Sequence, residues 1–517
     1  MINVASILEF NVKEHPEKTA IVFADMKLSF SQINAMANQV ANGLVSAGIG
    51  KGDKVAISCP NLPFFPAIYY GVLKLGAVLV PLNVLLKGRE IAFHLNDSDA
   101  KAFFCFQDMP ELSIAQEGYA GFQEAKGCEH LWIITADPQG PSPIEGFPTM
   151  AQMMGAQSPV FDMMLLQSDD SAVILYTSGT TGKPKGAELT HMNLIMNSRV
   201  CVDLLQLSED DIQLIVAPLF HSMAQTIQMN AGFTKGNTLV LVPRFAPDVI
   251  LDTMQKENVT VFVGVPTMYW ALLNYDDKEN RFDFEKISNT LRIGLSGGAS
   301  IPGEILKGIE KKYKIPILEG YGISETSPGV AFNALNKPRK QGSVGSPIWG
   351  VDLKIVGLDN QELPTGEVGE IVVRGHNVMK GYYKKPEETA KAVDKDGWFY
   401  TGDLGRVDED GYVFIVDRLK DMIIRGGYNI YPREIEEVLM IHPDISLAAV
   451  IGVPHESHGE EVKAFVVLNE GSQATEEEIV SWSKEQMAAY KYPRIVQIQQ
   501  TLPMTATGKI LKKELKV

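Results

Sequence analysis

The sequence has few cysteines, no excess of basic residues and no long hydrophobic run, and each shortage excludes a class of protein. Only four cysteines occur among 517 residues, and no two of them form a C-x-x-C pair. This scarcity argues against a disulfide scaffold and favours reduced, mostly buried thiols in a reducing compartment. Lysine and arginine total 47 against 63 acidic residues, a formal net charge of −16. That balance argues against a nucleic-acid partner and against binding of anionic membranes through overall charge.

The most hydrophobic run, residues 75–86, is too short to cross a membrane. It covers 12 residues and contains Pro81 and Asn83, whereas a spanning helix needs about 20 apolar residues. The first residues carry acids and a proline where a signal peptide needs an unbroken apolar stretch. We therefore expect a soluble, cytoplasmic protein. A weak peripheral membrane contact and a dimer both stay open, because no sequence pattern decides either.

What is present is the composition of a globular protein. Hydrophobic residues make up 45% of the chain, enough for a packed interior, and charged residues make up 21%, too few for a disordered polyelectrolyte. The length predicts roughly three structural units. We find no internal repeat and no low-complexity segment, so we expect several packed domains.

Helix and strand patterns alternate along most of the chain. Apolar residues between Ile33 and Val45 follow helical spacing, with Gly48 placed to end the helix, and residues 64–75 predict a second helix. Short apolar runs predict buried strands over residues 55–59, 77–82, 102–106, 131–135, 172–176, 238–242 and 259–263. This rhythm predicts layered α/β subdomains with largely parallel sheets.

The pattern changes after about residue 351. Hairpin strands are predicted over 351–356 and 370–374, followed later by a small unit with a helix from Pro432 and a capping box of Thr475 and Glu478. Strands of that unit are predicted over 447–453 and 462–468, and the domain boundary is predicted within 417–428. The expected α/β fold is a large N-terminal domain of layered subdomains plus a β-rich piece, followed by a small α+β domain.

A loop rich in glycine, hydroxyl groups and lysine follows the predicted strand 172–176. Its three glycines allow backbone N–H groups to turn inward, and its hydroxyls and lysines are donors for phosphate oxygens. Lys183 is followed by Pro184, so the loop is not a Walker motif. The predicted phosphate-binding residues are Thr177, Ser178, Gly179, Thr180, Thr181, Gly182, Lys183 and Lys185.

The loop YTSGTTGKPKG resembles the signature of the adenylate-forming superfamily, which contains acyl- and aryl-CoA synthetases, firefly luciferase and the adenylation domains of peptide synthetases. Other motifs of the family follow in its order over nearly the whole chain: PLFH at 218–221, GVPT at 264–267, SGGA at 296–299, EGYGISET at 319–326, YTGD at 400–403, DRLKD at 417–421 and TGK at 507–509. The closest resemblance is to bacterial fatty-acid–CoA ligases.

The resemblance implies a ligase that works in two steps. A carboxylate attacks the α-phosphorus of ATP and releases pyrophosphate, and the thiol of CoA then attacks the acyl-adenylate to give acyl-CoA and AMP. Two anions meet in the first step, so the site needs cations and a metal. ATP and CoA are therefore the implied co-substrates and Mg²⁺ the implied cofactor.

The resemblance also assigns the catalytic residues. Glu325 is the magnesium-facing carboxylate, with Thr177 or Thr180 as a further candidate ligand. Lys509 would contact the substrate carboxylate and the α-phosphate. His221 is expected to have a positional role at the mouth of the acyl site, because an ionised carboxylate needs no general base.

A second set of residues is assigned to the nucleotide. Asp403 and Arg418 resemble the pair that holds the ribose hydroxyls, and Tyr321 would lie against adenine. Ser324 or Thr326 would donate a hydrogen bond to the α-phosphate. The implied nucleotide site is completed by Gly298, Ala299, Glu319, Gly320, Gly322 and Ile415.

The family also implies a domain that moves between the two steps. Residues 1–417 would be the AMP-binding domain, 418–420 the hinge and 421–517 the C-terminal domain, with 433–509 as its core. Lys420 occupies the pivot, where many relatives carry aspartate. Rotation would withdraw Lys509 and bring a pantetheine tunnel to the site. The implied tunnel residues are Gly426, Gly427 and Tyr428.

The substrate is inferred from the implied acyl pocket, whose residues are Phe220, Met223, Gln225, Gly264, Gly297 and Ile323. Methionine is adaptable and the glycines leave room, which favours medium- to long-chain fatty acids. No lysine or arginine lies between His221 and Gly232 to neutralise a second carboxylate. Gln225 stands where some long-chain enzymes carry a tryptophan gate. A hydroxycinnamate- or benzoate-like acid, or a carrier protein as acceptor, therefore stays an alternative.

Two other patterns lead to competing hypotheses. The G-x-S-x-G pattern at 294–298 places Ser296 as in the nucleophile elbow of a serine hydrolase, with His442, His455 and His458 downstream. That hypothesis leaves the phosphate-type loop and the C-terminal TGK unexplained. His455 and His458 also suggest metal binding, but no third ligand with matching spacing is visible.

Overall fold

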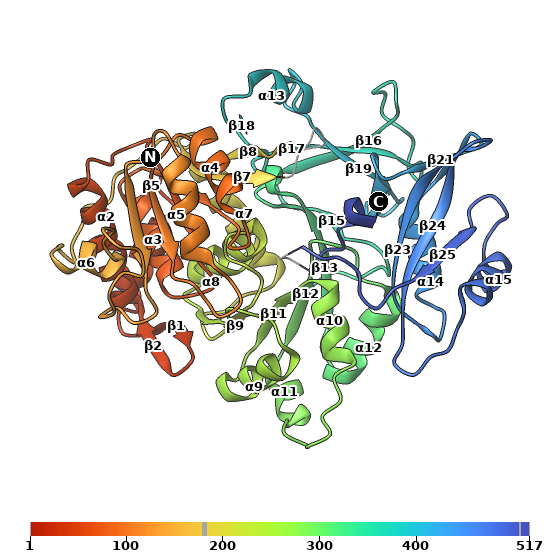
Figure 1. Cartoon of the computed structure of the whole chain (residues 1–517), viewed down its shortest axis with the longest axis horizontal. Helices are drawn as coiled ribbons and strands as arrows, with labels where there is room; N and C mark the ends of the chain where they lie inside the picture. Colours follow the sequence, from red (N-terminus) through yellow and green to blue (C-terminus); the bar gives the residue numbers. More distant parts are fainter. Residues whose placement is uncertain (1, 178–182, 506–507, 516–517) are drawn as a thin grey trace.

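The structure is a computed structural model that describes residues 2–177, 183–505 and 508–515 (Figure 1). The orange strands of the first sheet lie on one side of the molecule in Figure 1, and the blue C-terminal strands lie on the other. A second large sheet, which includes the red strands near the N-terminus, completes the N-terminal part, so the chain is a layered α/β protein with a smaller α+β domain at its C-terminal end, as predicted.

The first sheet has seven strands in the order β18-β8-β7-β4-β3-β5-β6. Its strands are β3 (Lys54–Ser58), β4 (Val78–Pro81), β5 (Ala100–Phe106), β6 (His130–Ile134), β7 (Ser171–Thr177), β8 (Lys185–Thr190) and β18 (Gly381–Tyr382). The strands β3 to β7 pair in parallel, and β8 and β18 are antiparallel. The associated helices are α2 (Phe30–Ser46), α3 (Phe64–Lys74), α4 (Gly88–Asp97), α5 (Ile114–Glu124) and α6 (Met150–Gly155).

The second sheet has nine strands in the order β15-β14-β13-β12-β11-β9-β10-β1-β2. They are β1 (Thr19–Phe23), β2 (Met26–Ser29), β9 (Ile212–Ile215), β10 (Thr238–Leu241), β11 (Val261–Gly264), β12 (Ile293–Ser296), β13 (Ile317–Gly322), β14 (Gly329–Phe332) and β15 (Ser346–Pro347). The parallel strands β11, β12 and β13 bring their carboxyl ends to one edge. Ligands of open parallel sheets bind at such an edge.

The helical segments of this part pack around the sheet and connect its strands. They are α1 (Ser6–Glu14), α7 (His191–Leu204), the π-helix η1 (Met223–Asn230), α8 (Ala231–Thr234), α9 (Pro247–Glu257), α10 (Pro266–Leu273), α11 (Phe284–Thr290), α12 (Gly303–Tyr313) and the 3₁₀ turn η2 (Ser324–Thr326). π-Helical turns are rare and occur frequently at functional sites.

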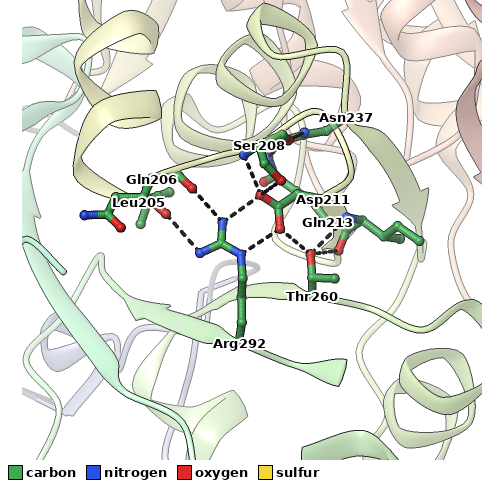
Figure 2. A network of polar contacts seen from close by, with 9 residues as sticks. Leu205, Gln206, Ser208, Asp211, Gln213, Asn237, Thr260 and Arg292 are labelled. Atoms are coloured by element: carbon green, nitrogen blue, oxygen red, sulfur yellow. Dashed lines mark hydrogen bonds and ion pairs between the residues drawn. The ribbon is translucent and has the colours of Figure 1, made fainter. Parts of the chain in front are cut away.

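An ion pair between a buried carboxylate and a partly buried guanidinium joins three strands at the opposite, amino-terminal edge of this sheet (Figure 2). Arg292, which precedes β12, donates to both carboxylate oxygens of Asp211, which precedes β9, at 2.7 Å each. Thr260, which precedes β11, donates its hydroxyl to the same carboxylate at 2.7 Å. Burial raises the pKa of Asp211, but the Arg292 guanidinium and the hydrogen bonds outweigh it and hold that pKa below its usual value.

The rest of the chain forms two further sheets. The antiparallel sheet consists of β16 (Val351–Val356), β17 (Gly369–Gly375), β19 (Phe399–Val407) and β20 (Val413–Arg418), with α13 (Pro386–Ala392) inserted. The C-terminal domain contains β21 (Ile423–Arg425), β22 (Tyr428–Ile430), α14 (Pro432–Leu439), β23 (Ile445–His455), β24 (Gly459–Leu468), α15 (Glu476–Gln486), β25 (Ile495–Ile498) and η3 (Lys512–Leu515). The capping box of Thr475 and Glu478 is present at the start of α15.

The buried apolar residues form separate cores on the two sides of the predicted boundary. The large core runs from Val4 to Val413 in the sequence, and a second core gathers residues between Ile423 and Val496. All four cysteines are buried free thiols, as predicted. Within the described residues, no helix combines the length and the apolar character that crossing a membrane requires.

Candidate active site

The two residues assigned to ribose lie together beside the tyrosine assigned to adenine. Asp403 is on β19, Arg418 ends β20 and Tyr321 is on β13. The Tyr321 hydroxyl donates to Asp403 Oδ2 at 2.6 Å, and Arg418 Nε lies 3.5 Å from Asp403 Oδ1. Burial raises the pKa of Asp403 against the opposing effect of the Arg418 charge. The arrangement presents a buried carboxylate with a fixed orientation, suited to accept two hydroxyl donors.

Lys509 reaches this cluster from the C-terminal domain. Its Cε would lie 3.3 Å from a Cβ built on Gly298, and Gly508 next to it accepts a hydrogen bond from Thr267 Oγ1 at 3.2 Å. Burial, and then the nearby Arg418 charge, lowers the pKa of Lys509 to about 8, while Asp403 acts in the opposite direction. The ammonium therefore lies in a partly desolvated site where an added anion would stabilise its charge.

His221 lies close enough to Lys509 for the ammonium charge to affect its pKa. Burial, reinforced by the Lys509 charge, lowers the pKa of His221 to about 3, so the imidazole is neutral at physiological pH. The backbone N–H of Met223 donates to His221 Nδ1 at 3.3 Å, which makes Nδ1 the acceptor nitrogen. A neutral ring with a fixed tautomer agrees with the positional role expected for His221.

A small, mainly apolar cavity lies beside Lys509. The space in it that a water-sized molecule can occupy is about 10 Å³, so an acyl chain can enter only if the lining side chains move. Its lining residues are Ala217, Pro218, His221, Met223, Val265, Met268, Gly298 and Lys509. Among them Lys509 is the one charged group, so a carboxylate beside it and an apolar body against the other residues would match the lining.

The sequence predicted only part of this pocket. Met223 lines it, and a side chain on Gly297 would come within 3.2 Å of Met223 Sδ. Gln225 is fully buried and donates to the carbonyl of Leu219 at 2.9 Å instead. Five of the six predicted pocket residues, all of them described, do not line it: Phe220, Gln225, Gly264, Gly297 and Ile323. Conversely, Ala217 and Met268 line it without having been predicted, because neither belongs to a family motif.

Glu325 lies where three chain segments meet. The hydroxyls of Thr177 and Tyr382 both donate to Glu325 Oε1, at 3.0 and 3.1 Å. Lys185 forms an ion pair with Glu388 of α13, and its Nζ lies 5.1 Å from the centroid of the Tyr382 ring. The predicted phosphate ligand Lys185 is thus directed at a carboxylate and a ring in this structure.

The donors around Glu325 suit a hard cation. Carboxylate and hydroxyl oxygens are the ligands that Mg²⁺ prefers, and the ion usually keeps substrate phosphates and waters as its other ligands. Within the described ranges there is no group of three or more histidine, cysteine, aspartate or glutamate side chains that could hold a metal. The rings of His455 and His458 stack on each other with their centroids 4.9 Å apart.

The phosphate-type loop is described at its two ends. Thr177 closes β7, and Lys183 is exposed just before β8. The predicted phosphate ligands Ser178, Gly179, Thr180, Thr181 and Gly182 lie outside the described residues.

The remaining predicted nucleotide residues lie on β13, in the loops after β12 and β13, and on β20. On β13 are Glu319, Gly320 and Gly322, of which Gly322 is so close to the carbonyl of Pro328 that no side chain would fit. Burial raises the pKa of Glu319 to about 7, opposed mainly by Arg433. The hydroxyl of Thr326 donates to the Pro328 carbonyl at 2.6 Å, which leaves the half-buried Ser324 as the better placed donor. Ala299 is exposed and Ile415 is half-buried.

The predicted hinge and CoA residues follow β20 in the sequence, at the start of the C-terminal domain. Lys420 is exposed, and Gly426 and Gly427 have left-handed backbone angles of φ +57° and +85° in the turn between β21 and β22. Tyr428 is 59% exposed and stacks on Tyr490 at 4.9 Å. None of these described residues lines the pocket at Lys509.

The geometry gives no support to a serine hydrolase. Ser296 is 2% exposed, and its buried hydroxyl has no hydrogen-bond partner within the described part of the chain. An activated nucleophile needs a base within hydrogen-bond reach.

Comparison with known proteins agrees with the motifs. A model of the family described as AMP-binding enzyme matches residues 8–383, and one described as AMP-binding enzyme C-terminal domain matches residues 434–509. The chain is 37% identical over 536 residues to the long-chain-fatty-acid–CoA ligase of Bacillus subtilis (strain 168), covering 99% of this chain and 93% of that one. It is also 37% identical over 505 residues to a feruloyl-CoA synthase of Amycolatopsis sp, covering 97% and 96% of the two chains.

Solved structures show the same fold. The ATP-bound MatB of Rhodopseudomonas palustris superposes with a TM-score of 0.90 at 33% identity, covering 100% of this chain and 98% of that one. The apo form of the same protein gives a TM-score of 0.79 at the same identity and coverage. The overall arrangement of this chain therefore resembles the ATP-bound form more than the apo form.

Proposed function

Because the chain belongs to the AMP-binding enzyme family and is an acyl-CoA ligase, we propose that it activates a medium- to long-chain fatty acid as its acyl-adenylate and transfers the acyl group to CoA. The observation that carries the proposal is the lining of the small cavity at Lys509, in which apolar side chains surround a single ammonium group. The ammonium binds the carboxylate, and the methionine, valine and alanine side chains move apart to accept an alkyl chain.

The first half-reaction needs the carboxylate and the α-phosphate of ATP to meet. Lys509 lines the cavity and is close enough to Asp403 and Arg418 to interact with their charges, so it can bind the carboxylate oxygen and the α-phosphate at once. Its charge offsets the negative charge that builds up on the phosphorus oxygens as the bond forms. Neutral His221 lines the cavity and takes no part in proton transfer, because the substrate carboxylate is already ionised and needs no base.

The nucleotide is held by the groups that converge on the carboxyl ends of β11 to β13. Asp403 accepts the ribose hydroxyls, Arg418 fixes the orientation of Asp403, and Tyr321 contacts the base. The loop from Thr177 to Lys183 and the hydroxyl of Ser324 donate to the phosphates. Mg²⁺, when bound with ATP, neutralises part of the triphosphate charge, and Glu325 with Thr177 would hold it.

Domain rotation separates the two half-reactions. We assign residues 1–417 to the N-terminal domain, 418–420 to the hinge around Lys420 and 421–517 to the C-terminal domain. The docked Lys509 and the greater likeness to ATP-bound MatB support the adenylating orientation here. For the thiol step Lys509 withdraws, and the backbone of Gly426, Gly427 and Tyr428 lines the pantetheine tunnel.

An aryl acid is the second candidate substrate. The relative at 37% identity described as a feruloyl-CoA synthase supports it. Position 225 supports it too, because it holds glutamine where some long-chain enzymes carry a tryptophan. The apolar lining, without a polar side chain besides His221 and Lys509, favours the fatty acid. The four free, buried thiols support a cytoplasmic location.

The test is acid-dependent pyrophosphate release from MgATP, with acids from acetate to palmitate, 4-coumarate and benzoate, each with and without CoA. We expect the highest kcat/KM for a medium- or long-chain acid and a sharp rise in turnover with CoA. A kcat/KM for 4-coumarate or benzoate tenfold above that for every fatty acid would assign the aryl substrate instead. Slow release that CoA does not change would point to a carrier-protein acceptor.

A further inference from the structure

Among the contacts of the described residues, the carboxylate of Glu325 is held through one oxygen. Thr177 Oγ1 donates to Oε1 at 3.0 Å, and the Tyr382 hydroxyl donates to the same oxygen at 3.1 Å. Over the described ranges 2–177, 183–505 and 508–515, no side chain donates to the other oxygen, Oε2. Two donors on one side fix the plane of the carboxylate and leave Oε2 available to a ligand.

Tyr382 is itself held in place by several contacts. Its strand β18 pairs with β8, with Tyr382 opposite Ala187. Its backbone N–H donates to Thr389 Oγ1 of α13 at 2.9 Å. Over its ring lies the ammonium of Lys185, which the ion pair with Glu388 keeps in position. The phenol therefore has little freedom to turn away from Glu325.

We propose that Tyr382 is a positioning residue for the metal–nucleotide complex: by donating to Oε1 it directs Oε2 of Glu325 toward the cation that accompanies ATP. The inference rests on the proposed function, since it needs Glu325 to face that cation. Lys185 then acts through the Tyr382 ring and α13, where the sequence had suggested a direct phosphate contact.

The expected effect follows from the number of donors. Loss of a partner that orients a metal ligand typically weakens metal binding about 10- to 100-fold. Thr177 still donates to Oε1 when the Tyr382 hydroxyl is absent. We therefore expect the lower end of that range, about tenfold.

The test uses the full chain with Tyr382→Phe, which keeps the ring under Lys185 and removes only the hydroxyl. Binding of Mn²⁺, a paramagnetic stand-in for Mg²⁺, is followed by electron paramagnetic resonance in the presence of α,β-methylene ATP. We expect the Kd of Mn²⁺ to rise about tenfold, while the Kd of AMP measured without metal stays that of the wild type. Tyr383→Phe is the matched control, because the Tyr383 hydroxyl donates to Asp99 at 2.7 Å and makes no contact with Glu325.

A double variant distinguishes a positioning role of Tyr382 from a structural effect that does not involve Glu325. Because Thr177 and Tyr382 share one oxygen, the double variant Thr177→Val with Tyr382→Phe should raise the Kd of Mn²⁺ by more than the product of the two single effects. An unchanged Kd in Tyr382→Phe, an equal rise in Tyr383→Phe, or simple multiplication of the two single effects would overturn the inference. A wild-type enzyme that binds no Mn²⁺ with the nucleotide would instead refute the proposed function.

Discussion

The charge of Lys509 should set the alkaline limit of adenylation. Burial lowers its pKa from 10.5 to about 8 in the ligand-free protein. A difference of that size corresponds to about 3 kcal/mol of unfavourable energy for the charged form at 1.36 kcal/mol per pH unit. The ammonium is charged below pH 8 and mostly neutral above it, so the free enzyme loses the cation that the carboxylate and the α-phosphate need as the pH rises.

The assay is ATP–pyrophosphate exchange without CoA, because the CoA thiol titrates in the same range. Between pH 7 and pH 9 we expect kcat/KM for ATP to fall about tenfold, since kcat/KM reports the pKa values of the free enzyme. The decline of kcat should lie at higher pH, because bound phosphate raises the pKa of Lys509. His221, with a pKa of about 3, stays neutral over this pH range and contributes nothing to the decline in kcat/KM.

Lys509→Arg is the control, because a guanidinium stays charged over the whole range. Its kcat/KM should be lower, since the geometry differs, but flat from pH 7 to pH 9.5. A wild-type profile that is flat over the same interval would refute the reasoning, as would a decline of equal steepness in Lys509→Arg.

Three further predictions concern stability, docking and the pocket. Asp211→Ala should lower the free energy of unfolding, measured in urea, by about 3–5 kcal/mol, because it leaves the partly buried guanidinium of Arg292 unpaired. The control Asp203→Ala removes an exposed ion pair and should change the free energy of unfolding by less than about 1 kcal/mol. Gly508→Ala should slow ATP–pyrophosphate exchange more than Gly471→Ala: both glycines have positive φ, but only at Gly508 would the new Cβ meet a side chain, at 2.7 Å. Met268→Trp should raise KM for the fatty acid and leave KM for ATP unchanged, because the bulky ring fills the pocket.

Much of the fold could be predicted because local patterns determine it. Buried parallel strands need continuous apolar runs, and each predicted strand of the two large sheets lies within two residues of its observed bounds at either end, for example 172–176 against Ser171–Thr177 for β7. The start of α15 was predictable because the capping box of Thr475 and Glu478 satisfies backbone donors locally.

The candidate site was predictable only where a motif carried it. Tyr321, the paired residues Asp403 and Arg418, and Lys509 come from three separate segments, which the structure brings close together. Tyr382 could not be found this way. It lies 57 positions from Glu325 in the sequence, and its role depends on the antiparallel pairing of a two-residue strand, which leaves no periodic pattern.

In the nine-stranded sheet, a stabilising ion pair lies at one edge and the candidate active site lies at the opposite edge. At the amino-terminal edge, Asp211 and Arg292 tie together the starts of β9 and β12 through a rigid, bidentate contact (Figure 2). At the carboxyl edge, Gly297 lies beside Met223, which lines the cavity at Lys509. Because the same strands connect the two edges, the ion pair fixes the spacing of the strands that carry the site without occupying any of its surface. A protein can therefore vary its acyl pocket at one edge while the other continues to hold the strands in register.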